Sequence, residues 1–258
     1  MGRRGALEID GAGAEGGGPR QTGGLRAARA RRDPLRDEPA GVGEAGRGGM
    51  GIVFHGKDQS LDRDVAIKVL PRRYSDNADF IARFQKEGRA AAKLNDPNIV
   101  AAYDVGNSGD HHYFVMEYVK GEPITEYCDR HTLDTRSRLE LFAKVCDAVS
   151  HGHQKGIIHR DLKPSNIFFS GEGFLKLCDF GIALDTGESD LTEVGLTVGT
   201  HRYMAPELIR GEVASPPTDL YALGCVLYRM LVGRPPFDGR NFAAIFEQHL
   251  HQVPESLQ

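Results

Sequence analysis

The sequence lacks the features that mark membrane-spanning, secreted and zinc-binding proteins. No run of about eighteen or more apolar residues occurs, and the first residues lack the apolar segment of a secretory signal. The four cysteines are far apart and form no Cys-x-x-Cys pair, so neither a zinc ribbon nor a disulfide framework is indicated. We therefore expect reduced, mostly buried thiols and a cytoplasmic protein without a membrane span.

The chain also lacks a strong excess of charge of either sign. Its formal net charge is -4, with 26% charged and 40% hydrophobic residues. This balance gives no reason to expect nucleic acid or a membrane surface as a partner, and it allows a sizeable core. One two-lobed domain or two small domains would fit the length.

Residues 1–40 lack aliphatic periodicity and are rich in Gly, Ala and Arg. Such a composition cannot bury enough apolar surface to offset the entropy of ordering, so we predict a disordered tail. Residues 1–36 hold eight Arg against four acids, which leaves a weak basic anchor as the alternative. The composition and the hydrophobic pattern of the sequence change at residue 41, and we expect one domain over 41–258.

The first part of this domain is rich in β-branched residues. Residues 65–70 and 113–118 predict strands, and residues 80–94 between them predict an amphipathic helix. We expect a small, sheet-rich lobe over about 41–119.

Helical periodicity dominates the second part. Apolar residues at helical spacing across 139–149 and the apolar run 220–231 predict helices, the second of them buried. Residues 166–169 and 174–179 predict a short hairpin set among these helices. The fold class is therefore α+β, with a larger helical lobe over about 120–258.

A glycine-rich stretch near the start of the domain matches the pattern Gly-x-Gly-x-x-Gly-x-Val. Glycines in such a turn let backbone N–H groups approach phosphate oxygens. Two registers fit, over 41–46 and over 46–53, and chance matching competes because glycine is common here. Only the second places an aliphatic residue two positions after the last glycine, so it is favoured. The nucleotide-contacting residues that it predicts are Ala45, Gly46, Arg47, Gly48, Gly49, Met50, Gly51, Ile52 and Val53.

Lys68 closes the apolar sequence Val-Ala-Ile-Lys. A charge at the end of a buried strand needs a partner. Glu87, on the helix that follows, can provide it, and the pair would hold the α- and β-phosphates of a nucleotide. An ordinary exposed helix glutamate is the alternative.

The most specific signal is the sequence His-Arg-Asp-Leu-Lys-Pro-Ser-Asn over 159–166, with Asp-Phe-Gly over 179–181 and Ala-Pro-Glu over 205–207. In this order and spacing the motifs resemble the protein kinase family, and the likeness runs from about residue 41 to the last residue. The amino-acid sequence around this loop is most similar to that of bacterial kinases of eukaryotic type. The resemblance implies a two-lobed kinase-like fold and a Ser/Thr kinase that transfers the γ-phosphoryl group of Mg-ATP to a protein hydroxyl.

By this resemblance, Asp161 orients the hydroxyl and accepts its proton, and Lys163 lies beside the γ-phosphate. Asn166 and Asp179 would hold Mg²⁺, a hard cation that prefers oxygen ligands. The lysine two positions after Asp161 is typical of kinases that act on Ser or Thr. The expected partners are ATP, Mg²⁺ and a protein with a Ser/Thr acceptor.

The same likeness assigns nucleotide contacts and regulation. Met116 lies at the gatekeeper position, and the hinge from Glu117 to Val119 would pair with adenine. Arg160 would pair with a phosphorylated residue of the activation segment, for which Thr192 or Thr197 is the hypothesis among Thr186, Ser189, Thr192 and Thr197. Autophosphorylation there would involve self-association of two chains. Thr200 is expected to hydrogen-bond near Asp161 and Lys163.

Four features depart from the family pattern. Ala45, where a larger aliphatic residue is usual, predicts a weak first strand, and Gly88 costs on the order of 1 kcal/mol of helix stability relative to Ala. The last helices of the helical lobe are expected to be missing, which would leave Glu207 a buried, unpaired carboxylate and an apolar face uncovered. The fourth departure is the long Gly- and Arg-rich start, for which an artefact of the assigned translation start is the hypothesis.

Other functions compete with an active kinase. A nucleotide-binding scaffold without catalysis is the first alternative, and an inactive fragment that does not fold stably is the second. A dinucleotide-binding protein is disfavoured, because here the glycines lead into another strand rather than a βαβ unit. The histidines at 111–112 and 151–153 lack a nearby ligand set, so we expect surface or capping roles for them.

Overall fold

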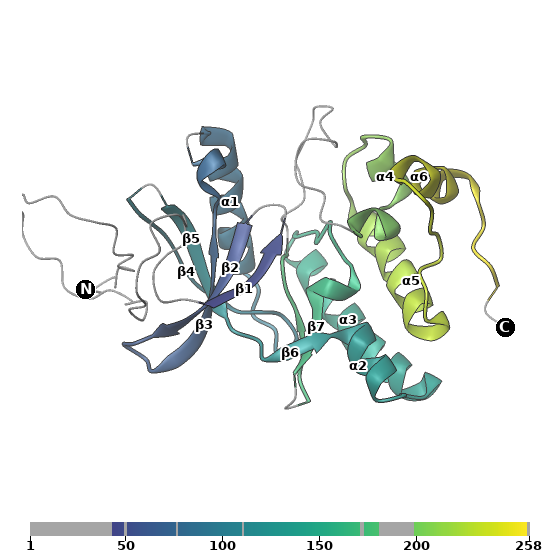
Figure 1. Cartoon of the computed structure of the whole chain (residues 1–258), viewed down its shortest axis with the longest axis horizontal. Coiled ribbons are helices and arrows are strands. Elements are labelled where there is room, and N and C mark those ends of the chain that lie inside the picture. The colour runs from purple at the N-terminus through teal and green to yellow at the C-terminus, as the bar shows by residue number, and fades with distance from the viewer. Residues whose placement is uncertain are drawn as a thin grey trace, which may run out of the picture. The chain divides into compact units, whose positions relative to one another are not determined.

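The described residues of the computed structural model are 43–48, 51–75, 77–109, 111–170, 173–180 and 199–256. The predicted tail over 1–40 lies outside them. The chain divides into a sheet unit, Met1–Gly88 with Ala102–Tyr118, and a helical unit, Arg89–Ala101 with Val119–Gln258. An antiparallel sheet followed by helices is the α+β organisation that the sequence predicts, and this prediction is confirmed (Figure 1).

The sheet unit is built on five antiparallel strands in the order β1-β2-β3-β5-β4. Side chains alternate across a strand, so Val65, Ile67 and Val69 share one face and pack with Phe54 and Val115. The strands are β1 (Gly43–Gly48), β2 (Gly51–Asp58), β3 (Arg63–Val69), β4 (Ala102–Ser108) and β5 (His111–Glu117). Both predicted strands of this lobe are thus present.

Helix α1 (Ala78–Ala91) follows the short 3-10 turn η1 (Arg72–Tyr74) and packs on the sheet. The rings of Phe84 and Phe114 lie 5.5 Å apart. A Cβ added to Gly88 would lie 2.7 Å from Cγ2 of Val105, so the glycine allows the helix to approach β4. The sequence-based cost of Gly88 therefore omitted a packing role, since propensity considers the helix alone.

The helical unit combines helices with a three-stranded sheet, β6-β7-β8, whose β7–β8 pair is the predicted hairpin. Its strands are β6 (Gly121–Pro123), β7 (Ile167–Ser170) and β8 (Leu175–Leu177). Its helices are α2 (Ile124–Arg130), α3 (Thr135–Gln154), α4 (Pro206–Ile209), α5 (Pro216–Val232) and α6 (Phe242–His251), with 3-10 turns η2 (Pro164–Asn166) and η3 (Thr200–Tyr203).

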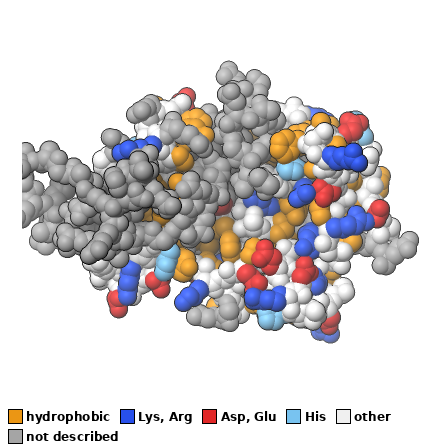
Figure 2. All heavy atoms as spheres, viewed as in Figure 1, with side chains coloured by type: hydrophobic (Ala, Val, Ile, Leu, Met, Phe, Trp, Pro, Cys, Tyr) orange, Lys and Arg blue, Asp and Glu red, His pale blue; other side chains and the backbone are white. Residues whose placement is uncertain are grey.

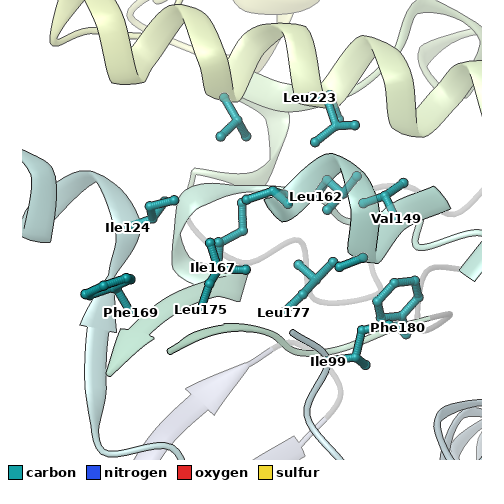
Figure 3. Close-up of a cluster of buried hydrophobic side chains, with 14 of the residues drawn as sticks. Ile99, Ile124, Val149, Leu162, Ile167, Phe169, Leu175, Leu177, Phe180 and Leu223 are labelled. Atoms are coloured by element: carbon teal, nitrogen blue, oxygen red, sulfur yellow. The ribbon is translucent and has the colours of Figure 1, made fainter. Parts of the chain in front are cut away.

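One hydrophobic core joins these elements (Figure 3). Val149 of α3, Leu223 of α5 and Ile167 of β7 contribute to it, and Leu162 and Phe180 pack into the same cluster. Because Leu162 and Phe180 flank the motif residues Asp161 and Asp179, the core fixes the backbone on which these carboxylates are carried.

A partly buried arginine ties three helices together. Arg138 of α3 donates from Nη1 to the carbonyl of Met230 in α5 at 2.6 Å and from Nη2 to the carbonyl of Cys128 in α2 at 3.0 Å. Its Nη1 also contacts Asp129 at 2.9 Å, and Arg229 contacts the other oxygen of that carboxylate at 3.1 Å. Each of these partly buried cations therefore has an anionic partner, which reduces the cost of removing it from water.

Helix α5 departs from the sequence prediction in one respect. Most of its apolar residues are buried, but the side chain of Leu220 is 59% exposed.

Figure 2 shows acidic and basic side chains interspersed over one face of the described residues, with hydrophobic side chains exposed between them. Within the described ranges, no helix is both long and apolar enough to cross a membrane.

The four cysteines are free thiols, as predicted. Cys128 and Cys225 are buried, and burial raises the pKa of the Cys225 thiol to about 12. Cys146 and Cys178 are partly exposed. The two buried thiols therefore act as small apolar side chains of the core.

Candidate active site

The loop His159–Asn166 brings together three of the predicted site residues. The Lys163 ammonium donates to Oδ2 of Asp161 at 2.8 Å and to the hydroxyl of Thr200 at 2.7 Å. The amide Nδ2 of Asn166 donates to the Asp161 carbonyl at 2.8 Å and to Oδ2 at 3.2 Å. The predicted hydrogen bond of Thr200 is thereby confirmed. Asp161 is held through one carboxylate oxygen from two sides.

His159 links this loop to the Asp-Phe-Gly motif. Its ring is fully buried and lies 4.7 Å from the ring of Phe180. The N–H of Asp161 reaches Nδ1 of His159 at 3.3 Å, so Nδ1 is the acceptor and Nε2–H donates to the Cys178 carbonyl at 2.9 Å. Cys178 N–H in turn donates to the Asn166 carbonyl at 2.9 Å. Asp179, one residue further on, is thereby fixed relative to Asn166.

Sequence reasoning missed Asp219, which anchors the start of the loop. Its carboxylate is 1% exposed and accepts the backbone N–H groups of His159 and Arg160, each at 2.8 Å. His153 Nε2 donates to the same carboxylate at 2.7 Å. A single Asp within the first turn of an otherwise apolar helix was the available signal, since a buried carboxylate needs several donors. The expected surface or capping role of His153 is therefore wrong.

Two backbone positions in this region are left-handed. Arg160 has φ 70° and Asp179 has φ 61°, values that non-glycine residues adopt rarely and at a cost of about 1 to 3 kcal/mol. Asp219 compensates at Arg160, because it binds the N–H of that residue. Strain of this kind is typical of functional sites, and here it lies at Asp179 itself and at Arg160, the residue before Asp161.

The glycine-rich hairpin and Lys68 belong to the sheet unit. Gly48 pairs with Gly51 across the β1–β2 hairpin, and the turn residues Gly49 and Met50 lie outside the described residues. Ala45 lies at a register shift between Glu44 and Gly46, so the predicted weak first strand is formed but carries a bulge. The other predicted nucleotide contacts lie on β1 (Gly46, Arg47) and β2 (Ile52, Val53).

Lys68 is 4% exposed and lies on β3 opposite Val53 and Phe114. Its ammonium is 5.6 Å from the centre of the Phe114 ring. Glu87 lies in α1, and its side chain falls outside the described residues, so the ion pair with Lys68 stays a prediction.

The predicted hinge follows β5. Met116 is 8% exposed and pairs with Ala66, and Glu117, the last residue of β5, pairs with Val65. Val119 is the first residue of the helical unit after this strand. Binding of adenine by this segment stays a prediction.

The activation segment is described only at its end. The candidate phosphorylation sites Thr186, Ser189, Thr192 and Thr197 lie outside the described residues. Glu207 is partly exposed and accepts a hydrogen bond from the Thr218 hydroxyl at 2.7 Å. The expectation of a buried, unpaired carboxylate at Glu207 is therefore wrong, because a residue of α5 supplies a donor.

Comparisons with known proteins agree with this geometry. The family model of the protein kinase domain matches residues 41–258. Serine/threonine-protein kinase PrkC of Bacillus subtilis is 41% identical over 214 residues, and serine/threonine-protein kinase PknB of Mycolicibacterium smegmatis is 43% identical over 219 residues. These alignments cover 83% and 81% of this chain but only 33% and 35% of the relatives. The chain thus spans about a third of the length of the curated relatives it matches, and it belongs to the protein kinase domain family.

Proposed function

We propose that the chain is a Ser/Thr protein kinase that uses Mg-ATP. The observation that carries the proposal is the arrangement of Asp161. Its Oδ2 is held by Lys163 and Asn166, whereas no donor among the described residues reaches Oδ1. The side chain is 22% exposed. A carboxylate fixed at one oxygen and open at the other suits a base that orients a hydroxyl and accepts its proton.

Each residue then has a distinct task in the transfer. The acceptor oxygen forms a bond to the γ-phosphorus, the bond from that phosphorus to the β-phosphate oxygen breaks, and the hydroxyl proton passes to Oδ1 of Asp161. Lys163 offsets negative charge on the transferred group from a position set by Thr200. In this reaction catalysis is mostly positioning and electrostatics, which is why a rigid loop matters more than a reactive side chain.

The residues present fit a magnesium nucleotide. Nδ2 of Asn166 donates to Asp161, so Oδ1 of Asn166 remains as an oxygen ligand, and no donor in the described ranges reaches it. Asp179 offers a carboxylate as a further oxygen ligand. The backbone two residues before it is held by a hydrogen bond from the Leu177 N–H to the Asn98 carbonyl. Mg²⁺ is usually held by one or two such protein oxygens together with phosphates. When bound, Mg-ATP supplies the phosphoryl group and neutralises its charge.

The test is transfer of labelled γ-phosphate from Mg-ATP to a generic basic protein. We expect Asp161→Asn to reduce transfer roughly 10²- to 10⁴-fold while ATP binding persists. Asp147→Asn is the matched control, because Asp147 is an exposed aspartate on α3, and it should behave as wild type. Wild-type chain that binds ATP but transfers no label would contradict the proposal and support a non-catalytic scaffold.

We further propose autophosphorylation between Asp179 and Glu207. Support comes from the family membership and from the Arg160 backbone, which Asp219 fixes beside the Asp161 site. Mapping of phosphorylated residues after the same incubation should place label on Thr192 or Thr197. Label confined to residues outside 179–207 would contradict this part of the proposal.

A further inference from the structure

One face of helix α5 is apolar and accessible to solvent. Five residues on this face follow one another at alternating intervals of three and four positions, which is the spacing of a stripe along one side of a helix. Leu220 is 59% exposed, and the other members range from partly exposed to exposed. No charged residue interrupts the series. We call it the α5 stripe, and it consists of Pro217, Leu220, Gly224, Leu227 and Leu231.

The opposite face of α5 packs within the chain. Leu223 and Val226 belong to the hydrophobic core, and Figure 3 shows the side chain of Leu223 directed into it. At 3.6 residues per turn, Val226 lies roughly opposite the centre of the stripe around the helix axis. Leu220 and Gly224 therefore stay exposed within the part of the chain that the structure describes.

Gly224, at the centre of the stripe, gives a second and independent indication of a partner. A glycine inside a helix destabilises that helix relative to alanine. Nothing lies within 4 Å of the position that a Cβ of Gly224 would occupy, in contrast to Gly88 and Gly152. Packing among the described residues therefore does not require a glycine at position 224. Because a residue without a side chain lets another backbone approach closely, this position suits the point at which a second helix crosses α5.

We propose that the α5 stripe binds the same stripe of a second copy of this chain, with the two helices antiparallel. The stripe is nearly symmetric about Gly224. Leu220 lies four positions before the glycine and Leu227 three after it, and Pro217 and Leu231 lie seven positions to either side. A two-fold axis through Gly224 therefore places Leu220 of one copy beside Leu227 of the second copy. This self-complementarity is what a two-fold interface requires.

Charges at the two ends of α5 favour the antiparallel arrangement. Glu212 is exposed four residues before the helix begins, and Arg234 is 52% exposed two residues after it ends. In an antiparallel pair the end that carries Glu212 adjoins the end that carries Arg234 of the second copy, so opposite charges meet. Arg234 also contacts Glu255 of its own chain, and Arg210 accompanies Glu212. The attraction therefore orients the pair and adds little affinity.

The small size of the stripe sets the strength of the dimer. A standard interface has about 20 to 30 residues on each side, far more than this stripe supplies. We therefore expect a weak dimer with Kd on the order of 10 to 100 μM. Sedimentation velocity over a series of chain concentrations from about 5 to 500 μM covers this range and measures the Kd.

Two substitutions in the stripe should weaken the dimer for different reasons. Leu220→Asp places a charge in the apolar contact and should raise Kd about 10-fold or more. Gly224→Ala holds the two helices apart and should raise Kd roughly 10-fold, although it stabilises the helix within one chain. Leu139→Asp is the matched control and should leave Kd unchanged, because Leu139 is a 43% exposed leucine on α3, outside the stripe.

Disulfide cross-linking tests the antiparallel geometry. When Leu220→Cys and Leu227→Cys chains are mixed and oxidised by air, bridges should join position 220 of one chain to position 227 of the other, because these positions adjoin across the two-fold axis. The wild-type chain, in which Cys146 and Cys178 are partly exposed, measures the background. Bridges that join position 220 to position 220 more often than to 227 would indicate a parallel pair and overturn the proposal.

The concentration series gives the other decisive outcomes. A chain that stays monomeric throughout would overturn the proposal, because the stripe would then have no second copy bound to it. A dimer whose Kd is unchanged by both Leu220→Asp and Gly224→Ala would also overturn it, because the contact would lie elsewhere on the chain. None of these measurements uses phosphate transfer, so their outcome is independent of the proposed kinase function.

Discussion

Two buried polar clusters of the helical unit differ in how completely they are hydrogen-bonded. Around the His159–Asn166 loop, the Asp219 carboxylate accepts two backbone N–H groups and the His153 ring. Around η3 and α6, His201 and His249 each keep one ring nitrogen without a partner among the described residues. The first cluster contains a buried carboxylate, and the second contains two buried imidazole rings.

The difference shows two ways of burying a titratable group. A buried carboxylate is tolerated when donors saturate its oxygens, because an unpaired charge would cost several kcal/mol. A buried imidazole with incomplete bonding is tolerated when it stays neutral, and burial lowers the pKa of both His201 and His249 accordingly. The first cluster should therefore depend on its hydrogen bonds, and the second on pH.

Removal of the Asp219 charge is expected to have the largest effect. Asp219→Asn keeps the shape of the side chain but places an amide NH₂ group against N–H donors of the loop. We expect the free energy of unfolding to fall by about 3 kcal/mol and kcat to fall roughly 10²-fold, since the loop that carries Asp161 loses its anchor. Denaturant titration and the phosphate-transfer assay measure the two effects.

Asp129→Asn is the matched control for this prediction. Asp129 likewise accepts several hydrogen bonds, in this case from the side chains of Arg138 and Arg229, but its own side chain is 42% exposed. Exposed pairs are typically worth about 1 kcal/mol or less. If Asp219→Asn were as mild as Asp129→Asn, saturation of the buried carboxylate would not be what holds the loop.

The sequence predicted the residues that touch one another along the chain better than those joined by packing. Lys163 and Asn166 could be assigned beside Asp161 because all three lie in one short motif. Asp219 could not, because it follows Asp161 by 58 positions in sequence and reaches the loop only through the tertiary fold. Propensity and motif carry no information on such a contact.

Predictions made from the local sequence of one element failed where contacts with neighbouring elements determine the structure. Gly88 was counted only as a weak helix former, yet a side chain there would meet Val105. Leu220 lies in an apolar run, yet its side chain is exposed. Only one side of α5 packs into the core, and Leu220 lies outside that side. Strand β6 has three residues, including Pro123, too few for a period-2 pattern to reveal.

The histidine cluster should make stability depend on pH. The pKa of His249 is about 4 in the folded chain and about 6.5 in the unfolded chain, so between these values only the unfolded chain binds the proton. The stabilisation from neutral His249 is therefore complete above pH 6.5 and is lost as pH falls toward 4. We expect a loss on the order of 2 to 3 kcal/mol over that window, which His249→Gln should abolish.

Denaturant titrations of the wild-type chain and of His249→Gln at pH 7 and pH 4 measure this loss of stability. Lowered carboxyl pKa values, such as that of Asp58, also cost stability in acid, but they are common to both proteins and cancel in the difference. Hydrogen bonds from Ser60, Leu61 and Arg63 outweigh burial in lowering that pKa. Identical pH dependence in wild type and His249→Gln would remove the distinction between the two clusters.

The smallest expected effect tests whether the loop cluster depends on packing as well as on hydrogen bonds. A Cβ at Gly152 of α3 would lie 2.5 Å from Cε1 of Phe180, whose ring contacts His159. Gly152→Ala should therefore cost about 1 to 3 kcal/mol through overpacking and reduce kcat, because Phe180 adjoins Asp179. Gly224→Ala in α5 is the control, since no atom lies within 4 Å of its Cβ position, and it should gain up to about 1 kcal/mol of helix stability. Wild-type kcat in Gly152→Ala would mean that hydrogen bonds alone position the two motif carboxylates.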